Sequence, residues 1–279
     1  MSLLVEPEVL ATLPGDTRAR VLDARFSLAD ASQGRSLYNE AHIPGALYVD
    51  LEQDLSGPVI VGKTGRHPLP EAFHFSKKLQ SWGIDETTQV VVYDEGSHAM
   101  AARAWWLLRW MGLTRVCVLH TGLKGWLAED RPVSAELPVI TPTTFESEGG
   151  HMPVISADTI TRSLAADAAM TLIDARAVER FNGQVEPIDP RAGHIPGALC
   201  HPFTDNMDQQ GRFLPPPVLK ETLEPLLRGD DRAVFYCGSG VTACHNLLAM
   251  EYAGLGTGVL YPGSWSEWVT DVNRPIAPR

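Results

Sequence analysis

The segment AVFYCGSGVTACHNLLAM, at residues 233–250, contains the cysteine best placed for chemistry. An apolar run typical of a buried strand leads to Cys237, two glycines flank Ser239, and a helix is expected from about Thr242. Such a turn directs backbone N–H groups toward one point, and the helix N-terminus adds a partial positive charge. Both features favour the thiolate, which is the nucleophilic form of cysteine. We therefore predict that Cys237 is a nucleophile; the alternative is a small apolar residue that ends a buried strand.

Two other motifs fit this segment less well. Gly238-x-Gly240-x-x-Ala243 after a strand imitates a dinucleotide-binding fingerprint, but only 36 residues follow Ala243, too few for the rest of a Rossmann domain. A cysteine phosphatase loop has an arginine six residues after its cysteine, where this chain has Ala243. Without that arginine, a phosphate dianion lacks its bidentate ligand, so a phosphatase is disfavoured.

The chain repeats its own motifs in the same order, and the first three pairs are separated by offsets of 143 to 152 residues. The repeated pairs are VLDAR at 21–25 and LIDAR at 172–176, HIPGAL at 42–47 and 194–199, and VVVYD at 90–94 and AVFYC at 233–237. A fourth, Trp-containing pair follows at 119–126 and 260–268. Ordered matches at a nearly constant offset indicate a duplicated domain, and each copy is long enough to hold its own core.

Short apolar runs alternate with helical segments in both copies, which predicts two three-layer α/β domains, each with a parallel sheet. We expect an N-terminal domain over residues 1–130, a linker over 131–152 and a C-terminal domain over 153–279. The linker prediction rests on three prolines, two glycines and no helical periodicity. The clearest expected strands and helices are 90–93, 116–119, 233–236, 71–82, 99–111, 215–227 and 242–252.

Composition narrows the classes of function. The 279 residues carry a formal net charge of -11, which argues against the basic footprint of a nucleic-acid-binding protein but allows a locally positive site for an anionic substrate. No run reaches the roughly 18 apolar residues of a membrane span, and the N-terminus lacks the features of a secretory signal, so a cytoplasmic protein is expected. Four cysteines without a CxxC motif make a poor disulfide or zinc framework, so no metal is expected.

The tandem DAR, HIPGA and strand–cysteine motifs, with the Trp-rich ending, resemble those of the two-domain rhodanese sulfurtransferases over nearly the whole chain. The resemblance implies transfer of a sulfane sulfur from a donor to a thiophilic acceptor through a cysteine persulfide, without a metal or organic cofactor. Within that family, Cys237 to Thr242 resembles the loop of the 3-mercaptopyruvate type. Thiosulfate-using members typically carry basic residues where this chain has Gly238 and Ser239.

The resemblance also implies roles for individual residues. Cys237 would carry the sulfur, and backbone N–H groups of the loop would stabilise the thiolate and the persulfide anion. Arg180, in ERFNG, matches an arginine that holds the donor carboxylate, and Arg191, in DPRAGHIPG, is a second candidate. The loop residues expected to contact donor or sulfur are Gly238, Gly240, Val241 and Thr242.

Members of the 3-mercaptopyruvate type are thought to use a Ser–His–acid relay. Ser239 matches the serine, and His67 in GRHPLP resembles the histidine. The acid would be Asp50 or Glu52 in YVDLE. Such a relay would protonate the departing enolate or activate a nucleophile. The alternative for His67 is a loop histidine in solvent.

The first copy has Asp94 where the second has Cys237. A carboxylate cannot attack sulfur and would repel an anionic donor, so we predict that the N-terminal copy is non-catalytic and covers the C-terminal site. The expected partners are a small-molecule donor and an acceptor such as cyanide, a thiol or thioredoxin, with no nucleic acid or membrane. Two alternatives are a thiosulfate sulfurtransferase with the same mechanism and a non-catalytic rhodanese module that binds a protein.

Overall fold

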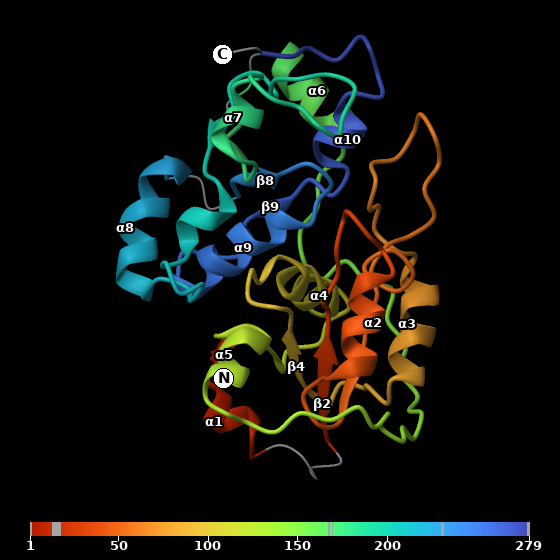
Figure 1. The fold of residues 1–279 in the computed structure, drawn as a ribbon. Coiled ribbons are helices and arrows are strands. Elements are labelled where there is room, and N and C mark those ends of the chain that lie inside the picture. Colours follow the sequence, from red (N-terminus) through yellow and green to blue (C-terminus); the bar gives the residue numbers. More distant parts are fainter. Residues whose placement is uncertain (1, 13–17, 167, 169, 230–231, 278–279) are drawn as a thin grey trace. The chain divides into compact units, whose positions relative to one another are not determined.

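The computed structural model describes residues 2–12, 18–166, 168, 170–229 and 232–277. The chain forms two compact units, one made of residues 1–57 and 70–152 and the other of residues 58–69 and 153–279. Both are α/β units with parallel sheets, which confirms the predicted fold class (Figure 1). Residues 58–69, which the sequence prediction placed in the N-terminal domain, belong to the second unit. This segment contributes residues to the site described below.

The first unit is built on a parallel sheet that has five strands in the described residues, in the order β1-β5-β4-β2-β3. The strands are β1 (Leu4–Val5), β2 (Ala19–Asp23), β3 (Ala46–Tyr48), β4 (Gln89–Tyr93) and β5 (Val116–Leu119). The helices are α1 (Pro7–Leu10), α2 (Gln33–Glu40), α3 (Ala72–Ser81), α4 (Ala99–Trp110) and α5 (Gly122–Ala128). The central strands are buried because they are apolar on both faces, as expected when helices cover a parallel sheet.

The second unit repeats this arrangement, with a sheet that has four strands in the described residues, in the order β7-β6-β8-β9. The strands are β6 (Leu172–Asp174), β7 (Leu199–Cys200), β8 (Val234–Tyr236) and β9 (Val259–Leu260). The helices are α6 (Ala157–Ala165), α7 (Val178–Phe181), the 3-10 helix η1 (Phe203–Asn206), α8 (Pro216–Leu227), α9 (Thr242–Tyr252) and α10 (Ser264–Trp268). The order matches β3-β2-β4-β5 of the first unit, so the repeated motifs occupy equivalent places.

The helices that follow the cysteine strand and its counterpart are buried on nearly every side. In α9 every residue from Ala243 to Met250 is buried, and in α4 nearly all residues are buried as well. Each packs on the two neighbouring strands of its own sheet, α4 on β4 and β5, and α9 on β8 and β9. A helix whose residues are mostly apolar around its whole circumference is typical of such an interior position, and this placement limits where the preceding turn can lie.

The repeated Asp–Arg motifs are buried ion pairs. Asp174 and Arg176 pair at 2.6 Å, with side chains 0% and 1% exposed, and Asp23 and Arg25 pair at 2.7 Å. The same nitrogen of Arg176, Nη2, also donates to the carbonyl of Gly193, directly before the second HIPGA motif. In the first unit, Arg25 Nη2 donates to the carbonyl of Ala41, directly before the first HIPGA motif. The motif therefore connects a strand end to the loop before the HIPGA motif in both units.

Residues 131–152, predicted as a linker, are all described and contain no helix; an isolated bridge joins Ser134 to His42. They pack within the first unit, where Thr143 N–H donates to the Gln80 carbonyl at 3.0 Å and His151 N–H to the Trp110 carbonyl at 3.0 Å. The second unit resumes at residue 153. These hydrogen bonds hold parts of the extended backbone against the rest of the first unit.

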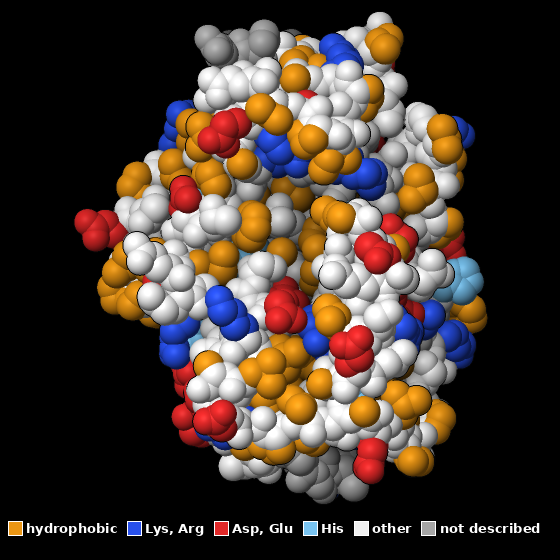
Figure 2. Space-filling model, in the orientation of Figure 1, with side chains coloured by type: hydrophobic (Ala, Val, Ile, Leu, Met, Phe, Trp, Pro, Cys, Tyr) orange, Lys and Arg blue, Asp and Glu red, His pale blue; other side chains and the backbone are white. Residues whose placement is uncertain are grey.

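The surface carries charges of both signs. On the face drawn in Figure 2, acidic and basic side chains of the described residues are interspersed. Among the described helices, none has the length and apolar content needed to cross a membrane. The acidic balance of the whole chain therefore does not collect into one uniform field on this face.

Candidate active site

Cys237 lies at the carboxyl end of the sheet in the second unit, between β8 and α9, and is 2% exposed. Its Sγ accepts a hydrogen bond from the backbone N–H of Gly240 at 3.1 Å. The N–H of Cys237 donates to Ser264 Oγ at 3.1 Å, and its carbonyl accepts from the N–H of Trp265 at 2.9 Å. The loop is therefore held to α10 on both sides of the sulfur, with a donor aimed at the sulfur itself.

Gly240 gives the loop its shape. Its φ is +77°, in the left-handed region, and a Cβ built there would lie 2.3 Å from the carbonyl oxygen of Pro262. Val241 follows as the residue before α9, and Thr242 begins the helix. Glycine is required at this position by both the backbone and the available space, so the Gly–x–Gly spacing has a structural cause.

Ser239 and His67 are brought together. Ser239 Oγ lies 2.8 Å from His67 Nδ1, and the two residues are 7% and 3% exposed. His67 belongs to the segment 58–69 that packs with the second unit. The interpretation of His67 as a solvent-exposed loop histidine is therefore wrong. The pair has the geometry needed to pass a proton.

The segment before His67 is anchored close to the cysteine loop. The N–H of Arg66 donates to Ser266 Oγ at 3.1 Å, and the N–H of Ser266 donates to the Gly238 carbonyl at 2.9 Å. A Cβ built on Gly65 would lie 2.4 Å from the carbonyl oxygen of Gly263, so the two backbones are in close contact. This contact positions the side chains of Arg66 and His67 in the site.

Asp50 and Glu52 belong to the first unit. The Asp50 carboxylate accepts the N–H groups of Glu52 at 2.9 Å and Gln53 at 3.0 Å, and it accepts the Tyr48 hydroxyl at 3.3 Å. Glu52 itself is exposed. The acid of the relay stays a prediction.

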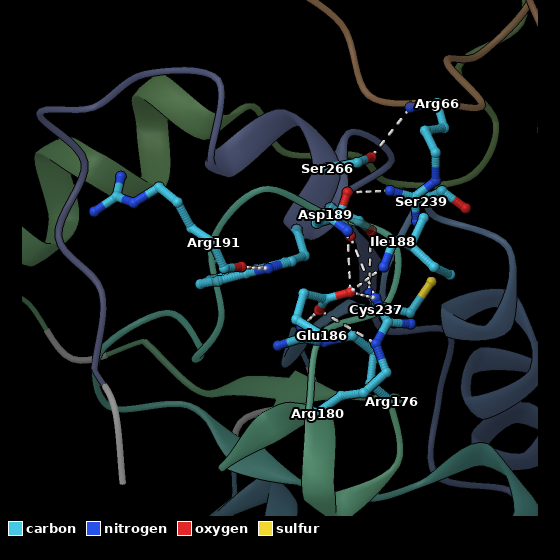
Figure 3. Close-up of polar contacts among 12 residues, drawn as sticks. Arg66, Arg176, Arg180, Glu186, Ile188, Asp189, Arg191, Cys237, Ser239 and Ser266 are labelled. Atoms are coloured by element: carbon cyan, nitrogen blue, oxygen red, sulfur yellow. Dashed lines mark hydrogen bonds and ion pairs between the residues drawn. The ribbon is translucent and has the colours of Figure 1, made fainter. Parts of the chain in front are cut away.

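Two arginines reach the cysteine loop from different segments (Figure 3). A Cβ built on Gly238 would lie 3.0 Å from Arg66 Nη2 and 3.4 Å from Arg180 Nη1. Arg180, on α7, was expected here from the sequence. Arg66 was missed, although its place directly before His67 was a usable signal. Together they place two guanidinium groups beside Gly238.

Each of these arginines is paired with buried acid. Arg180 Nη2 contacts Glu186 Oε1 at 2.7 Å and Asp189 Oδ2 at 3.3 Å, and Arg66 forms an ion pair with the other oxygen of Asp189. Burial raises the pKa of Asp189, and the nearby negative charge of Glu186 adds to this effect. For Glu186, burial also acts to raise the pKa, but hydrogen bonds from Arg180 and from the Asp189 N–H outweigh it and lower the pKa overall.

Arg191 is placed differently. Its carbonyl accepts the indole N–H of Trp265 at 2.9 Å, and its guanidinium points away from Cys237 in Figure 3. This placement does not support the expectation that Arg191 holds the donor. The indole contact gives the residue a structural role through its backbone.

The other cysteines have less reactive surroundings. Burial and the negative charge of Asp174 raise the pKa of Cys200 to about 12, and burial raises the pKa of Cys117. Cys244 is fully buried, and its Sγ donates to the Gly240 carbonyl at 3.3 Å. Cys237 is the cysteine whose sulfur accepts a loop N–H group in the second unit.

In the equivalent loop of the first unit, the carboxylate of Asp94 accepts the N–H groups of the loop. The carboxylate of Asp94 accepts the N–H groups of Gly96 and His98 at 2.9 Å, Met100 at 3.1 Å and Ala101 at 3.3 Å. The loop therefore keeps its anion-binding form, with a carboxylate in place of a sulfur. This arrangement supports the prediction that the N-terminal copy is non-catalytic.

Comparison with known protein families detects the same duplication. The profile of the rhodanese-like domain matches residues 6–129 and 156–271. A probable 3-mercaptopyruvate sulfurtransferase of Pseudomonas aeruginosa is 49% identical over 98% of this chain and 97% of its own length. A putative thiosulfate sulfurtransferase, SseB of Mycobacterium tuberculosis, is 37% identical over 98% and 96%. The crystal structure of the 3-mercaptopyruvate sulfurtransferase SseA from Escherichia coli has a TM-score of 0.80 at 30% identity, over 96% of this chain and 100% of that one.

Replacing Gly240 with alanine tests the loop geometry. The added Cβ must move Pro262 or the loop, which pulls the Gly240 N–H away from Cys237, so we expect alkylation of Cys237 by iodoacetamide to slow about tenfold. Peptide-level mass spectrometry measures the rate. The control is Gly254→Ala, where φ is +75° but a Cβ meets nothing within 4 Å. Equal rates in the two variants would contradict the account.

Proposed function

We propose that this chain, which belongs to the family of proteins with rhodanese-like domains, is a sulfurtransferase that takes a sulfur atom from 3-mercaptopyruvate and passes it to a thiophilic acceptor. The observation that carries this proposal is the contact between the Gly240 N–H and Cys237 Sγ at the start of α9. A backbone donor aimed at the sulfur, close to the positive end of a helix, stabilises the thiolate before the reaction and the persulfide after it.

In the first half-reaction, the Cys237 thiolate attacks the donor sulfur. The carbon–sulfur bond of 3-mercaptopyruvate breaks, and its electron pair stays on carbon as the enolate of pyruvate. The proton of the donor thiol leaves the newly bound sulfur, and one proton reaches the enolate carbon. Cys237 is then a persulfide anion, and pyruvate departs. The cysteine splits one difficult transfer into two easier displacements.

In the second half-reaction, the acceptor attacks the outer sulfur of the persulfide. The sulfur–sulfur bond breaks, and the Cys237 thiolate is the leaving group. A leaving group stabilised by the Gly240 N–H departs more readily, so the same contact serves both halves. Cyanide, a small thiol or thioredoxin all have the required nucleophile. The choice of acceptor, like a cytoplasmic location, stays a prediction.

Arg66 and Arg180 are suited to holding the donor carboxylate. Both guanidinium groups lie next to Gly238, one residue from the nucleophile, and a planar guanidinium binds a carboxylate with two parallel hydrogen bonds. The donor would then present its thiol to Cys237. Arg191 has no part in this assignment because its guanidinium points elsewhere (Figure 3).

Ser239 and His67 are suited to moving the proton. Ser239 belongs to the loop that carries the proposed nucleophile, and its 2.8 Å contact with His67 is shielded from solvent. A buried hydroxyl–imidazole pair accepts the thiol proton and returns it to the enolate carbon without bulk water. Asp50 or Glu52 as the third member stays a prediction.

The alternative donor is thiosulfate, which needs the same cysteine and leaves as sulfite. The similarity to the putative thiosulfate sulfurtransferase of M. tuberculosis favours this donor. Against it, the residues of the loop itself carry no cationic side chain, and the cationic groups nearby are already paired with Glu186 and Asp189. A protein-binding module without catalysis would have no use for the N–H directed at Cys237 Sγ.

Steady-state sulfur transfer tests the proposal. We expect the purified protein to show a higher kcat/KM with 3-mercaptopyruvate than with thiosulfate, using cyanide and a dithiol as acceptors. Cys237→Ser should lose transfer from both donors, whereas Cys117→Ser, a buried cysteine of the first unit, should keep it. A preference for thiosulfate would support the alternative donor. Activity with neither donor would overturn the enzyme proposal.

The placement of the arginines leads to a second prediction. Arg66→Met and Arg180→Met each remove a charged ligand of the donor carboxylate, so kcat/KM for 3-mercaptopyruvate should fall about 10- to 100-fold, mainly through KM. Arg191→Met should change it by less than about threefold because that guanidinium points away. A larger loss in Arg191→Met than in Arg66→Met would contradict the assignment.

A further inference from the structure

Asp189 lies between the two arginines of the site. One carboxylate oxygen contacts Arg180 Nη2 at 3.3 Å, and the other forms an ion pair with Arg66 (Figure 3). The Asp189 side chain is 4% exposed, so water does little to screen these contacts. Its backbone N–H donates to Glu186 Oε1 at 3.1 Å, which fixes the loop that carries it.

The charges around this position nearly cancel. Arg66 and Arg180 contribute two positive charges next to Gly238, and Glu186 and Asp189 contribute two negative ones in direct contact with them. The site is thus rich in hydrogen-bond donors while its net charge is close to zero. A carboxylate with one charge benefits from the donors. An anion with two charges benefits less, because it also meets the buried acids.

Asp189 differs from Glu186 in its partners. Glu186 pairs with Arg176 as well as Arg180, and it accepts backbone N–H groups, so it has a part in the internal structure of the loop. Asp189 contacts the two guanidinium groups that reach Gly238. Its charge therefore acts directly on the groups that meet the donor.

We propose that Asp189 sets the charge preference of the donor site, favouring a singly charged α-keto acid thiol over doubly charged thiosulfate. This inference rests on the proposed function. Removing one negative charge helps a bound dianion about twice as much as a monoanion. The charges concerned are those of Asp189 and of the bound donor, and the effective dielectric constant between them is about 20 to 40. Under these conditions, one unit of charge difference between the two donors changes the ratio of their affinities about tenfold.

Asp189→Asn tests this inference because it keeps the shape and removes the charge. We expect the ratio of kcat/KM for thiosulfate to that for 3-mercaptopyruvate to rise about tenfold, through KM. Asp189→Glu should restore the wild-type ratio. Asp158→Asn, which removes the same charge from a side chain that is 79% exposed and pairs with Arg274, should leave the ratio unchanged.

Binding gives a readout that does not depend on turnover. In the Cys237→Ser background, titration calorimetry measures thiosulfate binding with and without Asp189→Asn, and the added substitution should tighten it about tenfold. Should Asp189→Asn fail to fold, Asp189→Ser makes the same charge change with a smaller side chain. Circular dichroism checks the fold of each variant.

The outcomes separate the inference from the proposed function. An unchanged ratio in folded Asp189→Asn, or an equal fall with both donors, would overturn the inference and leave Asp189 as a support for the arginines. Wild-type protein that transfers sulfur from neither donor would overturn the proposed function. Tighter binding of thiosulfate by the Asp189→Asn, Cys237→Ser protein would still support the charge effect in that case.

Discussion

The hydrogen bond from the Gly240 N–H to Cys237 Sγ is the constraint on which the rest of the site depends. It exists because the backbone turns through a left-handed glycine that has no room for a Cβ, and because α9, which is buried from Ala243 to Met250, starts there. The contacts of α10 with Cys237 and Gly238 hold that turn in place. The chemistry of the sulfur follows from the packing of the second unit.

Comparison of the two copies separates the features of the shared fold from the effect of the residue at the strand end, which is Asp94 in one copy and Cys237 in the other. Both share the order of four parallel strands and the same buried Asp–Arg pair, and in both a loop N–H group donates to the side chain at the strand end. In the first copy the Asp94 carboxylate accepts those N–H groups, so the loop already holds an anion. In the second copy Cys237 occupies the equivalent position. The residue at the strand end therefore decides whether the loop is filled by a carboxylate or presents a thiol, the group that we propose as the nucleophile.

Much of this could be predicted from the sequence, because local patterns determine it. The apolar runs and the repeated motifs predict the fold and the family, and the Gly–x–Gly spacing after Cys237 predicts the turn that surrounds its sulfur. The remainder depends on contacts between distant segments. Arg66 binds Ser266 across 200 positions of sequence, and no local pattern predicts that contact. Arg191 lies in a matching motif, but its backbone contact with Trp265 and the direction of its side chain depend on packing.

The central claim is that Cys237 carries the transferred sulfur, and mass spectrometry after brief exposure to 3-mercaptopyruvate without an acceptor tests it most directly. The account predicts a gain of one sulfur atom, located on the peptide that contains Cys237, absent in Cys237→Ser and removed by cyanide. No added sulfur, or sulfur found on Cys200 or Cys244 in place of Cys237, would contradict the account.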